Sequence, residues 1–290
     1  MKQKRFGFTL IELLVVIAII ALLLSIIMPA LNTVKQIAAY ATCMANQKGL
    51  ATCWILYSED NNGSIVGGST YRSSSSDLRP SPYRWVERPQ ANDEYNGTAL
   101  YTDDEYTLET RKNGIRAGKL FTYSENEKLY HCVADKRNVK NDEPYAKYRS
   151  YSIQGLMNSE DYETRSNEFT KITGYKQLKY TTPTSEAKMA EKVADIVMPA
   201  VKYVFVEEIE DTQRYLLGGW VLLNDGDFAW WDTPADFHND GSTFGFADGH
   251  AEKYKWKDKD TLEVINEGTD LHPDENIDLR WLVQGYIPKK

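Results

Sequence analysis

The feature that most constrains this chain is a continuous apolar segment close to its N-terminus. From Leu13 to Leu31 the only polar side chain is Ser25. With residues 8–11, the apolar stretch is about 20 residues long, which as a helix crosses about 30 Å of hydrocarbon. A cleaved signal peptide has a shorter apolar region of roughly 7–15 residues, followed closely by a small-residue cleavage site that we do not find here. We therefore expect one membrane-spanning helix over about residues 8–31.

The charges around this segment predict its orientation. Lys2, Lys4 and Arg5 precede it, and the next basic residue is Lys35. Basic residues are enriched on the cytoplasmic side of membrane helices, so we expect the N-terminus in the cytoplasm and the bulk of the chain on the opposite side.

A single carboxylate, Glu12, lies inside the apolar block. An acidic side chain at the centre of a membrane helix costs about 2.5–3.5 kcal/mol on insertion scales, and less near the end of a helix. The Glu12 side chain could simply extend toward the membrane–water interface. Alternatively, it has a positive partner: cleavage after Gly7 would give Phe8 a free amine, and the amine of a neighbouring copy could neutralise Glu12.

The N-terminal residues resemble a known signal. Residues 4–12, Lys-Arg-Phe-Gly-Phe-Thr-Leu-Ile-Glu, resemble the class III signal of type IV prepilins and type II secretion pseudopilins. The resemblance implies cleavage after Gly7 by a prepilin peptidase and N-methylation of Phe8. It also implies that Glu12 guides docking between subunits, and that Pro29 is the helix-loosening proline of this family.

A second resemblance lies near the C-terminus. His238 is followed by nine residues and then Asp248-Gly249. This is similar to the H-X9-DG segment (residues 238–249) of large pilin-like proteins related to secretion protein G. The segment Cys43–Gly63 resembles the helix end of the same group, whereas residues 64–199 resemble no family. The implied organisation is a leader over 1–7, a pilin helix over 8–58 and an extracytoplasmic globular β-rich domain over 59–290.

The remaining pattern predicts an α+β fold. After Pro29, apolar or small residues recur at helical spacing, and Ser58–Gly63 is a stop signal, so a helix from residue 8 to about 57 would be about 75 Å long. Proline lacks the backbone donor, so we expect bending or melting at Pro29. The residues expected on the packing face of the helix are Leu31, Val34, Ile37, Ala38, Ala41, Met44, Ala45, Ala51, Trp54 and Ile55.

Strands are expected later in the chain, over 201–206 and 215–223. A further pair, 243–247 and 251–256, flanks Asp248-Gly249, and Asp-Gly between alternating segments favours a β-hairpin. A short helix is expected over 184–195. Together these elements predict a long N-terminal helix packed on an antiparallel sheet.

The three cysteines allow a disulfide only through Cys132. Cys43 and Cys53 are ten residues apart, about 15 Å along a helix, whereas bonded cysteines have Cα atoms within about 7 Å. We favour Cys43–Cys132, which would connect the helix to the globular domain.

Candidate metal ligands are fewer and less specific. His238, Asp248 and His250 could form a zinc site by residue type, and Asp225 and Asp227 offer hard oxygens for calcium. The alternative is structural: Asp248-Gly249 makes a turn and His238 hydrogen-bonds nearby backbone. We expect no cofactor, and calcium is the candidate ion for the acidic residues.

The expected function is a structural pilin-like subunit of a bacterial inner membrane, assembling into a type II secretion pseudopilus. Its expected partners are the prepilin peptidase, further copies or other pilins through the N-terminal helix, and the inner-membrane assembly platform. A net charge of −8 speaks against a nucleic-acid partner, and no nucleophile or phosphate-binding motif indicates an enzyme. Two alternatives remain: a surface or adhesive pilin, and a solitary membrane-tethered binding module.

Overall fold

The fold is given by a computed structural model of the whole chain. It describes residues 10–68, 84–91, 107–136, 148–158, 190–209, 219–220, 222–224, 227–228, 230, 232–267 and 276–286. For residues 223–224 and 227–228 it describes the backbone alone.

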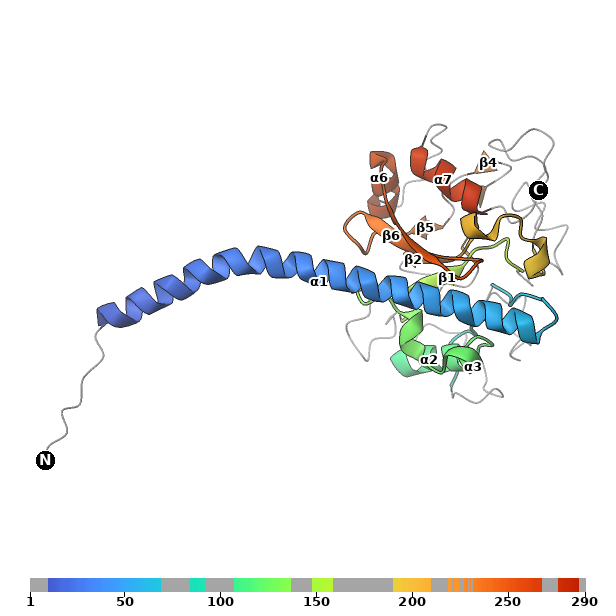
Figure 1. Cartoon of the computed structure of the whole chain (residues 1–290), viewed down its shortest axis with the longest axis horizontal. Helices are drawn as coiled ribbons and strands as arrows, with labels where there is room; N and C mark the ends of the chain where they lie inside the picture. The colour runs from blue at the N-terminus through green and yellow to red at the C-terminus, as the bar shows by residue number, and fades with distance from the viewer. Residues whose placement is uncertain are drawn as a thin grey trace, which may run out of the picture.

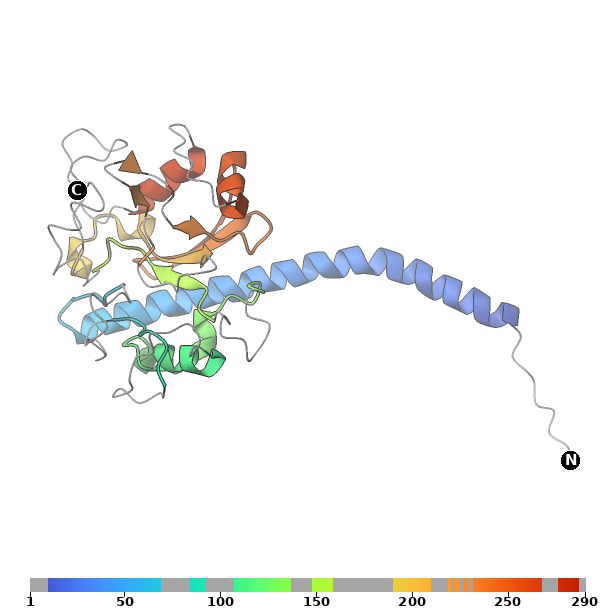
Figure 2. The same cartoon turned by 180° about the vertical axis from the view of Figure 1, so that it is seen from behind.

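One helix, α1 (Leu10–Asp60), runs for 51 residues and extends far beyond the globular domain (Figure 1). It ends where the sequence predicts, because Asn62 (φ 57°) and Gly63 (φ 79°) adopt left-handed backbone conformations. There the Gly63 N–H donates to the Ser58 carbonyl at 2.7 Å, which satisfies a terminal carbonyl of the helix. Pro29 lies inside α1. Of the bending or melting expected there, the structure shows no melting, because the helix continues through the proline, while its outer part curves (Figures 1 and 2).

The main sheet is antiparallel, with strand order β1-β2-β6-β7 and with β5 paired to β2. Its strands are β1 (Tyr151–Ile153), β2 (Tyr203–Ile209), β5 (Thr233–Pro234), β6 (Gly241–Phe246) and β7 (Ala251–Lys255). A separate pair is β3 (Leu223–Asn224) with β4 (Asp227–Phe228). The predicted α+β class, with a long helix on an antiparallel sheet, is confirmed.

The β6–β7 hairpin is confirmed, but its turn is longer than the two-residue turn that Asp-Gly favours. Strand β6 ends at Phe246, whose N–H donates across the hairpin to the carbonyl of His250 at 2.9 Å, so residues 247–249 form a three-residue turn. Gly249 alone in the turn has a positive φ, of 91°. Its N–H donates to the Phe246 carbonyl at 3.0 Å, which closes the turn.

The two faces of the sheet carry different cores. Helices α6 (Lys259–Glu267) and α7 (Ile277–Tyr286) cover one face, and α1 crosses the other (Figure 1). Beyond α1 lie α2 (Leu108–Arg116), α3 (Phe121–Ser124) and the 3-10 helix η2 (Glu127–Tyr130). Helix α1 is therefore packed on two sides, between the sheet and this group of short helices.

Other predictions need correction. The buried residues of α1 are Cys43, Gln47, Leu50, Ala51, Cys53, Trp54, Tyr57 and Ser58. Leu31, Val34, Ile37 and Ala38 are instead exposed, because α1 meets the globular domain only after this point. Ala41 and Ala45 are exposed as well, because the buried face of the helix passes through Cys43, Gln47 and Leu50. Of the helix expected over 184–195, residues 184–189 lie outside the described residues. The described remainder forms one 3-10 turn, η3 (Val193–Asp195), beside η4 (Pro199–Val201).

Candidate functional site

The first candidate site is the part of α1 that has no cover. Every large apolar side chain from Leu10 to Ile37 is between 46% and 75% exposed. The helix is long and apolar enough to cross a membrane. Exposing this much apolar surface to water is strongly unfavourable, so it requires lipid or other apolar helices around it. We call residues 10–37 the exposed segment of α1.

Two predicted assembly residues lie in this exposed segment. Glu12 is in the first turn of α1, where a carboxylate interacts favourably with the positive end of the helix dipole. Pro29 lies farther along, and the hydroxyl of Thr33 donates to its carbonyl at 3.2 Å. Gly7 and Phe8, the predicted processing residues, lie outside the described residues.

The second half of α1 is fixed to the sheet by close contacts. The amide of Gln47 is fully buried and donates to the carbonyl of Thr243 in β6 at 2.9 Å. At Gly245, an added Cβ would lie 3.0 Å from the backbone oxygen of Gln47. This glycine therefore permits the close approach of strand and helix. Trp54, also fully buried, packs into the core between α1 and its neighbours.

A second candidate site is a buried group of four chemically reactive side chains. Cys43 comes from α1, Cys132 from the turn after η2, Glu207 from β2, and His238 from the turn before β6. Their ligand-type atoms all lie within 4.8 Å of one another. The sulfurs of Cys43 and Cys132 are 3.0 Å apart as free thiols. We call these four residues the Cys2HisGlu cluster.

The imidazole of His238 lies between the cysteine sulfurs and the carboxylate of Glu207. Its Nε2 lies 3.4 Å from the sulfur of Cys132 and 3.0 Å from Oε1 of Glu207. The other carboxylate oxygen, Oε2, accepts from the hydroxyl of Ser242 at 3.2 Å and from the N–H of Thr243 at 2.9 Å. Glu207 is thus held by β6 while Oε1 faces the imidazole.

These contacts shift the acidity of the groups strongly. The hydrogen bond from Cys132 lowers the pKa of Cys43 against the opposing effect of burial, and His238 and Tyr151 lower it further. The same sulfur–sulfur contact, together with burial, raises the pKa of Cys132. Burial disfavours charged His238, but hydrogen bonds to Cys43 and Glu207 outweigh it and raise its pKa to about 9. The cluster therefore favours one thiolate beside a protonated imidazole.

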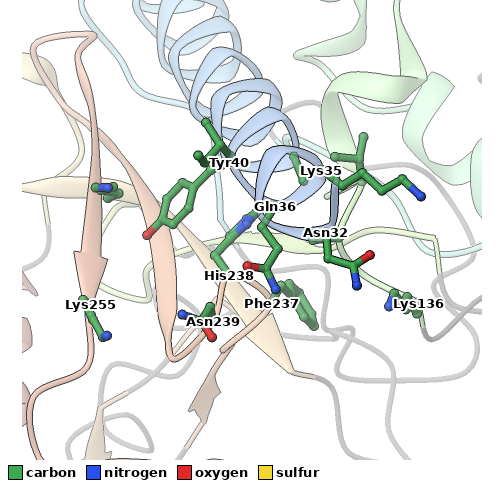
Figure 3. A pocket seen from close by; sticks show the side chains of 14 residues that line it. Asn32, Lys35, Gln36, Tyr40, Lys136, Phe237, His238, Asn239 and Lys255 are labelled. Atoms are coloured by element: carbon green, nitrogen blue, oxygen red, sulfur yellow. The ribbon is translucent and has the colours of Figure 1, made fainter. Parts of the chain in front are cut away.

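A groove of about 1050 Å³ opens beside the cluster, where α1 leaves the globular domain (Figure 3). His238 lines it, and the ring of Tyr40 stacks on the imidazole at a centroid distance of 4.4 Å. The groove is also lined by four lysines that are scattered in the sequence, Lys35, Lys136, Lys253 and Lys255. A basic surface here was not apparent from the sequence.

The structure does not bring the predicted metal ligands together. His238 precedes the first residue of β6, whereas Asp248 lies in the turn at the other end of the hairpin, about 17 Å along the strand. There Asp248 pairs with His250. Asp225 lies outside the described residues, as does the side chain of Asp227. Against the structural alternative, the Nε2 atom of His238 contacts the side chains of Glu207 and Cys132 rather than a backbone group.

Sequence reasoning missed Glu207. A signal was present, because an acidic residue directly after the apolar run 203–206 is unusual in a central strand. The expected Cys43–Cys132 pairing stays a prediction. The structure places the two sulfurs in contact, and it places Cys53 on α1 outside the cluster.

Comparison with known proteins supports one region of the chain. Residues 2–28 match the family model of the prokaryotic N-terminal methylation motif. No curated protein and no solved structure matches the chain. The motif indicates a precursor of the pilin and pseudopilin type, a class of structural subunits that are processed by a prepilin peptidase and assemble into polymers. Together with the apolar α1, it fits a protein anchored by a single membrane pass.

Proposed function

We propose that this chain is a pseudopilin, a structural subunit that assembles into a type II secretion pseudopilus. It is made as a precursor, cut after Gly7 and N-methylated at Phe8. It is then held in a bacterial inner membrane by residues 8–31, with its N-terminus cytoplasmic and its globular domain outside. Residues 1–7 are the leader, 8–58 the pilin helix and 59–290 the globular domain.

The observation that carries this proposal is the coincidence of the methylation motif with the exposed segment of α1. The motif, residues 2–28, ends inside a helix whose large apolar side chains stay exposed as far as Ile37. The same helix then becomes the centre of a folded core. One half of the helix can lie in lipid, and the other half is fixed in the globular domain. A subunit with this arrangement can leave the membrane and pack its helix against the helices of other copies.

Assembly would be driven by apolar contact between exposed segments and by Glu12. At roughly 25 cal/mol per Å² of apolar surface removed from water, helix packing dominates once a helix leaves lipid. In the membrane the hydrophobic contribution is absent, because lipid is as apolar as the helix. There, attraction between the Glu12 carboxylate and the N-terminal amine of a neighbouring subunit would orient the two helices as they associate. Pro29 weakens the local helix ladder and allows the exposed segment to adjust its curve. The further partners are the assembly platform and other pilins.

The first test concerns processing. The intact mass of the protein from cells with an active prepilin peptidase should correspond to residues 8–290 plus one methyl group. In a peptidase deletion strain the mass should instead include the leader. Retention of Met1–Gly7 in the wild-type strain would refute cleavage and, with it, the proposed maturation.

The second test concerns assembly. Glu12→Gln should strongly reduce polymer yield and recovery of secreted proteins in the culture medium. Glu59→Gln is a matched control, because Glu59 is an exposed acid near the other end of the same helix. Equal polymer yields from both variants would refute the role of Glu12. Loss of surface fibres with normal secretion would favour the surface pilin. Protein that never self-associates would favour the membrane-tethered module.

A further inference from the structure

We propose that the Cys2HisGlu cluster binds one zinc ion through Cys43, Cys132, Glu207 and His238. The site would be structural, because four protein ligands fill the tetrahedral coordination that zinc prefers and leave no position for a substrate. This inference does not depend on the proposed function, since it concerns the core of the globular domain.

The donor set matches zinc in type and in position. Two thiolates, an imidazole nitrogen and a carboxylate oxygen are the ligands that zinc takes in proteins. Zn–S bonds of about 2.3 Å in a tetrahedron put two sulfurs about 3.8 Å apart. The sulfurs lie at 3.0 Å, and Nε2 of His238 lies 3.4 Å from one sulfur and 3.0 Å from Oε1. Shifts of under about 1 Å, within the range of side-chain torsions, would open the centre for an ion.

The four ligands come from segments that are far apart in the sequence. Cys43 and Cys132 are 89 residues apart, and His238 is 106 residues beyond Cys132. Cys43, Cys132 and Glu207 have no exposed surface, and His238 is 6% exposed. A buried carboxylate needs a positive partner. Without an ion, protonated His238 supplies that partner to Glu207, whereas a zinc ion would supply it to Glu207 and to both sulfurs.

Surrounding groups would hold the ligands as metal sites require. Ser242 and Thr243 bind Oε2 of Glu207 and leave Oε1 directed at His238. The ring of Tyr40 covers the imidazole and fixes its plane. Such neighbours orient the ligands and increase metal affinity. The groove beside Tyr40 and His238 provides an entry path.

A disulfide between Cys43 and Cys132 explains less of this arrangement. It would use two of the four groups and require the sulfurs to approach to about 2.05 Å. Glu207 and His238 would remain as a buried pair with no contribution to the crosslink. A zinc ion uses all four groups. The remaining thiol proton and the imidazolium proton leave to water, because both sulfurs bind as thiolates and His238 binds as the neutral imidazole. The ion would connect α1 to three segments of the globular domain.

The test uses the full chain in detergent, reduced with a phosphine, stripped with a chelator and titrated with Zn²⁺ against a chromophoric competitor. We expect one tightly bound zinc per chain and a higher melting temperature with zinc. Substitution by Co²⁺ should give a sulfur-to-cobalt charge-transfer band and the intense visible bands of tetrahedral cobalt. A role of these residues in packing alone would produce no such spectrum.

Variants separate the ligands from the rest of the core. Cys43→Ser and Cys132→Ser should each weaken zinc binding by at least about 100-fold and reduce the charge-transfer band. Glu207→Gln, which keeps the shape of the side chain, should weaken zinc binding while the apo protein stays folded. Cys53→Ser is the matched control, because Cys53 is buried in the same helix outside the cluster, and it should bind zinc as the wild type does.

Two outcomes would overturn the proposal. One is a reduced, folded wild-type chain that binds zinc no more tightly than Cys43→Ser does. The other is protein that, isolated without reductant, carries no metal and has a mass two hydrogens lower, with a Cys43–Cys132 crosslink found by peptide mapping. The second result would assign the cysteines to a disulfide instead.

Discussion

Trp54 offers the most direct test of how α1 is joined to the globular domain. It is fully buried on the face of α1 that enters the core, and its indole N–H has no hydrogen-bond partner among the described residues. Two substitutions at this position should therefore have very different costs.

Trp54→Ala should lower the free energy of unfolding by about 3–5 kcal/mol, the usual cost of removing a buried aromatic side chain. At about 2–4 °C per kcal/mol for a domain of this size, the melting temperature should fall by roughly 6–20 °C. Trp54→Phe leaves a void of roughly 40 Å³, which costs about 1 kcal/mol at 24 cal/mol per Å³. It also removes the unsatisfied N–H, whose burial costs about 1–3 kcal/mol. The net change should be within about 1 kcal/mol of zero or stabilising.

The assay is urea and thermal unfolding of the full chain in detergent, followed by near-ultraviolet circular dichroism. Leu56→Ala serves as a control, because Leu56 lies on the same helix but is 42% exposed, and exposed substitutions usually change stability by under about 0.5 kcal/mol. A loss for Trp54→Phe as large as that for Trp54→Ala, or no loss for either, would refute this account of the helix–domain contact.

Two further predictions concern other parts of the core. Asp278→Asn should cost about 2–4 kcal/mol in unfolding free energy, because the buried carboxylate accepts from the Tyr254 hydroxyl at 2.9 Å and from the N–H groups of Lys257 and Asp258. Tyr254→Phe, which removes one of these bonds, should cost only about 1 kcal/mol, and equal costs would contradict the reasoning. Gly118→Ala should cost about 3 kcal/mol or prevent folding, because its Cβ would lie within 2.5 Å of backbone atoms of residues 85–86; unchanged expression and melting temperature would count against the packing described.

The elements that the sequence predicted are those with strong local signals. Helix α1 follows from a long apolar run with helical spacing and a glycine stop, and the β6–β7 hairpin follows from Asp248-Gly249 between alternating strands. The exact turn was not predicted, because Asp-Gly favours a two-residue turn, whereas here Gly249 alone takes a positive φ and closes a turn of three residues with Phe246.

Helix α7 was missed although its signal was present. Leu279, Leu282, Val283 and Tyr286 are buried at helical spacing, but the helix is short and close to the C-terminus. The Cys2HisGlu cluster is a different case. Cys43 and His238 were each singled out by type or motif, yet their meeting with Glu207 depends on how α1 crosses the sheet, which only the tertiary fold decides.

The continuity of α1 has a mechanical consequence. Its 51 residues span about 76 Å without a joint, since the helix passes from its exposed segment directly into the centre of the folded core. Because Gln47 and Trp54 are buried in that core, a force applied near Glu12 would be transmitted to the sheet through one unbroken helix, with bending confined to its curved outer part.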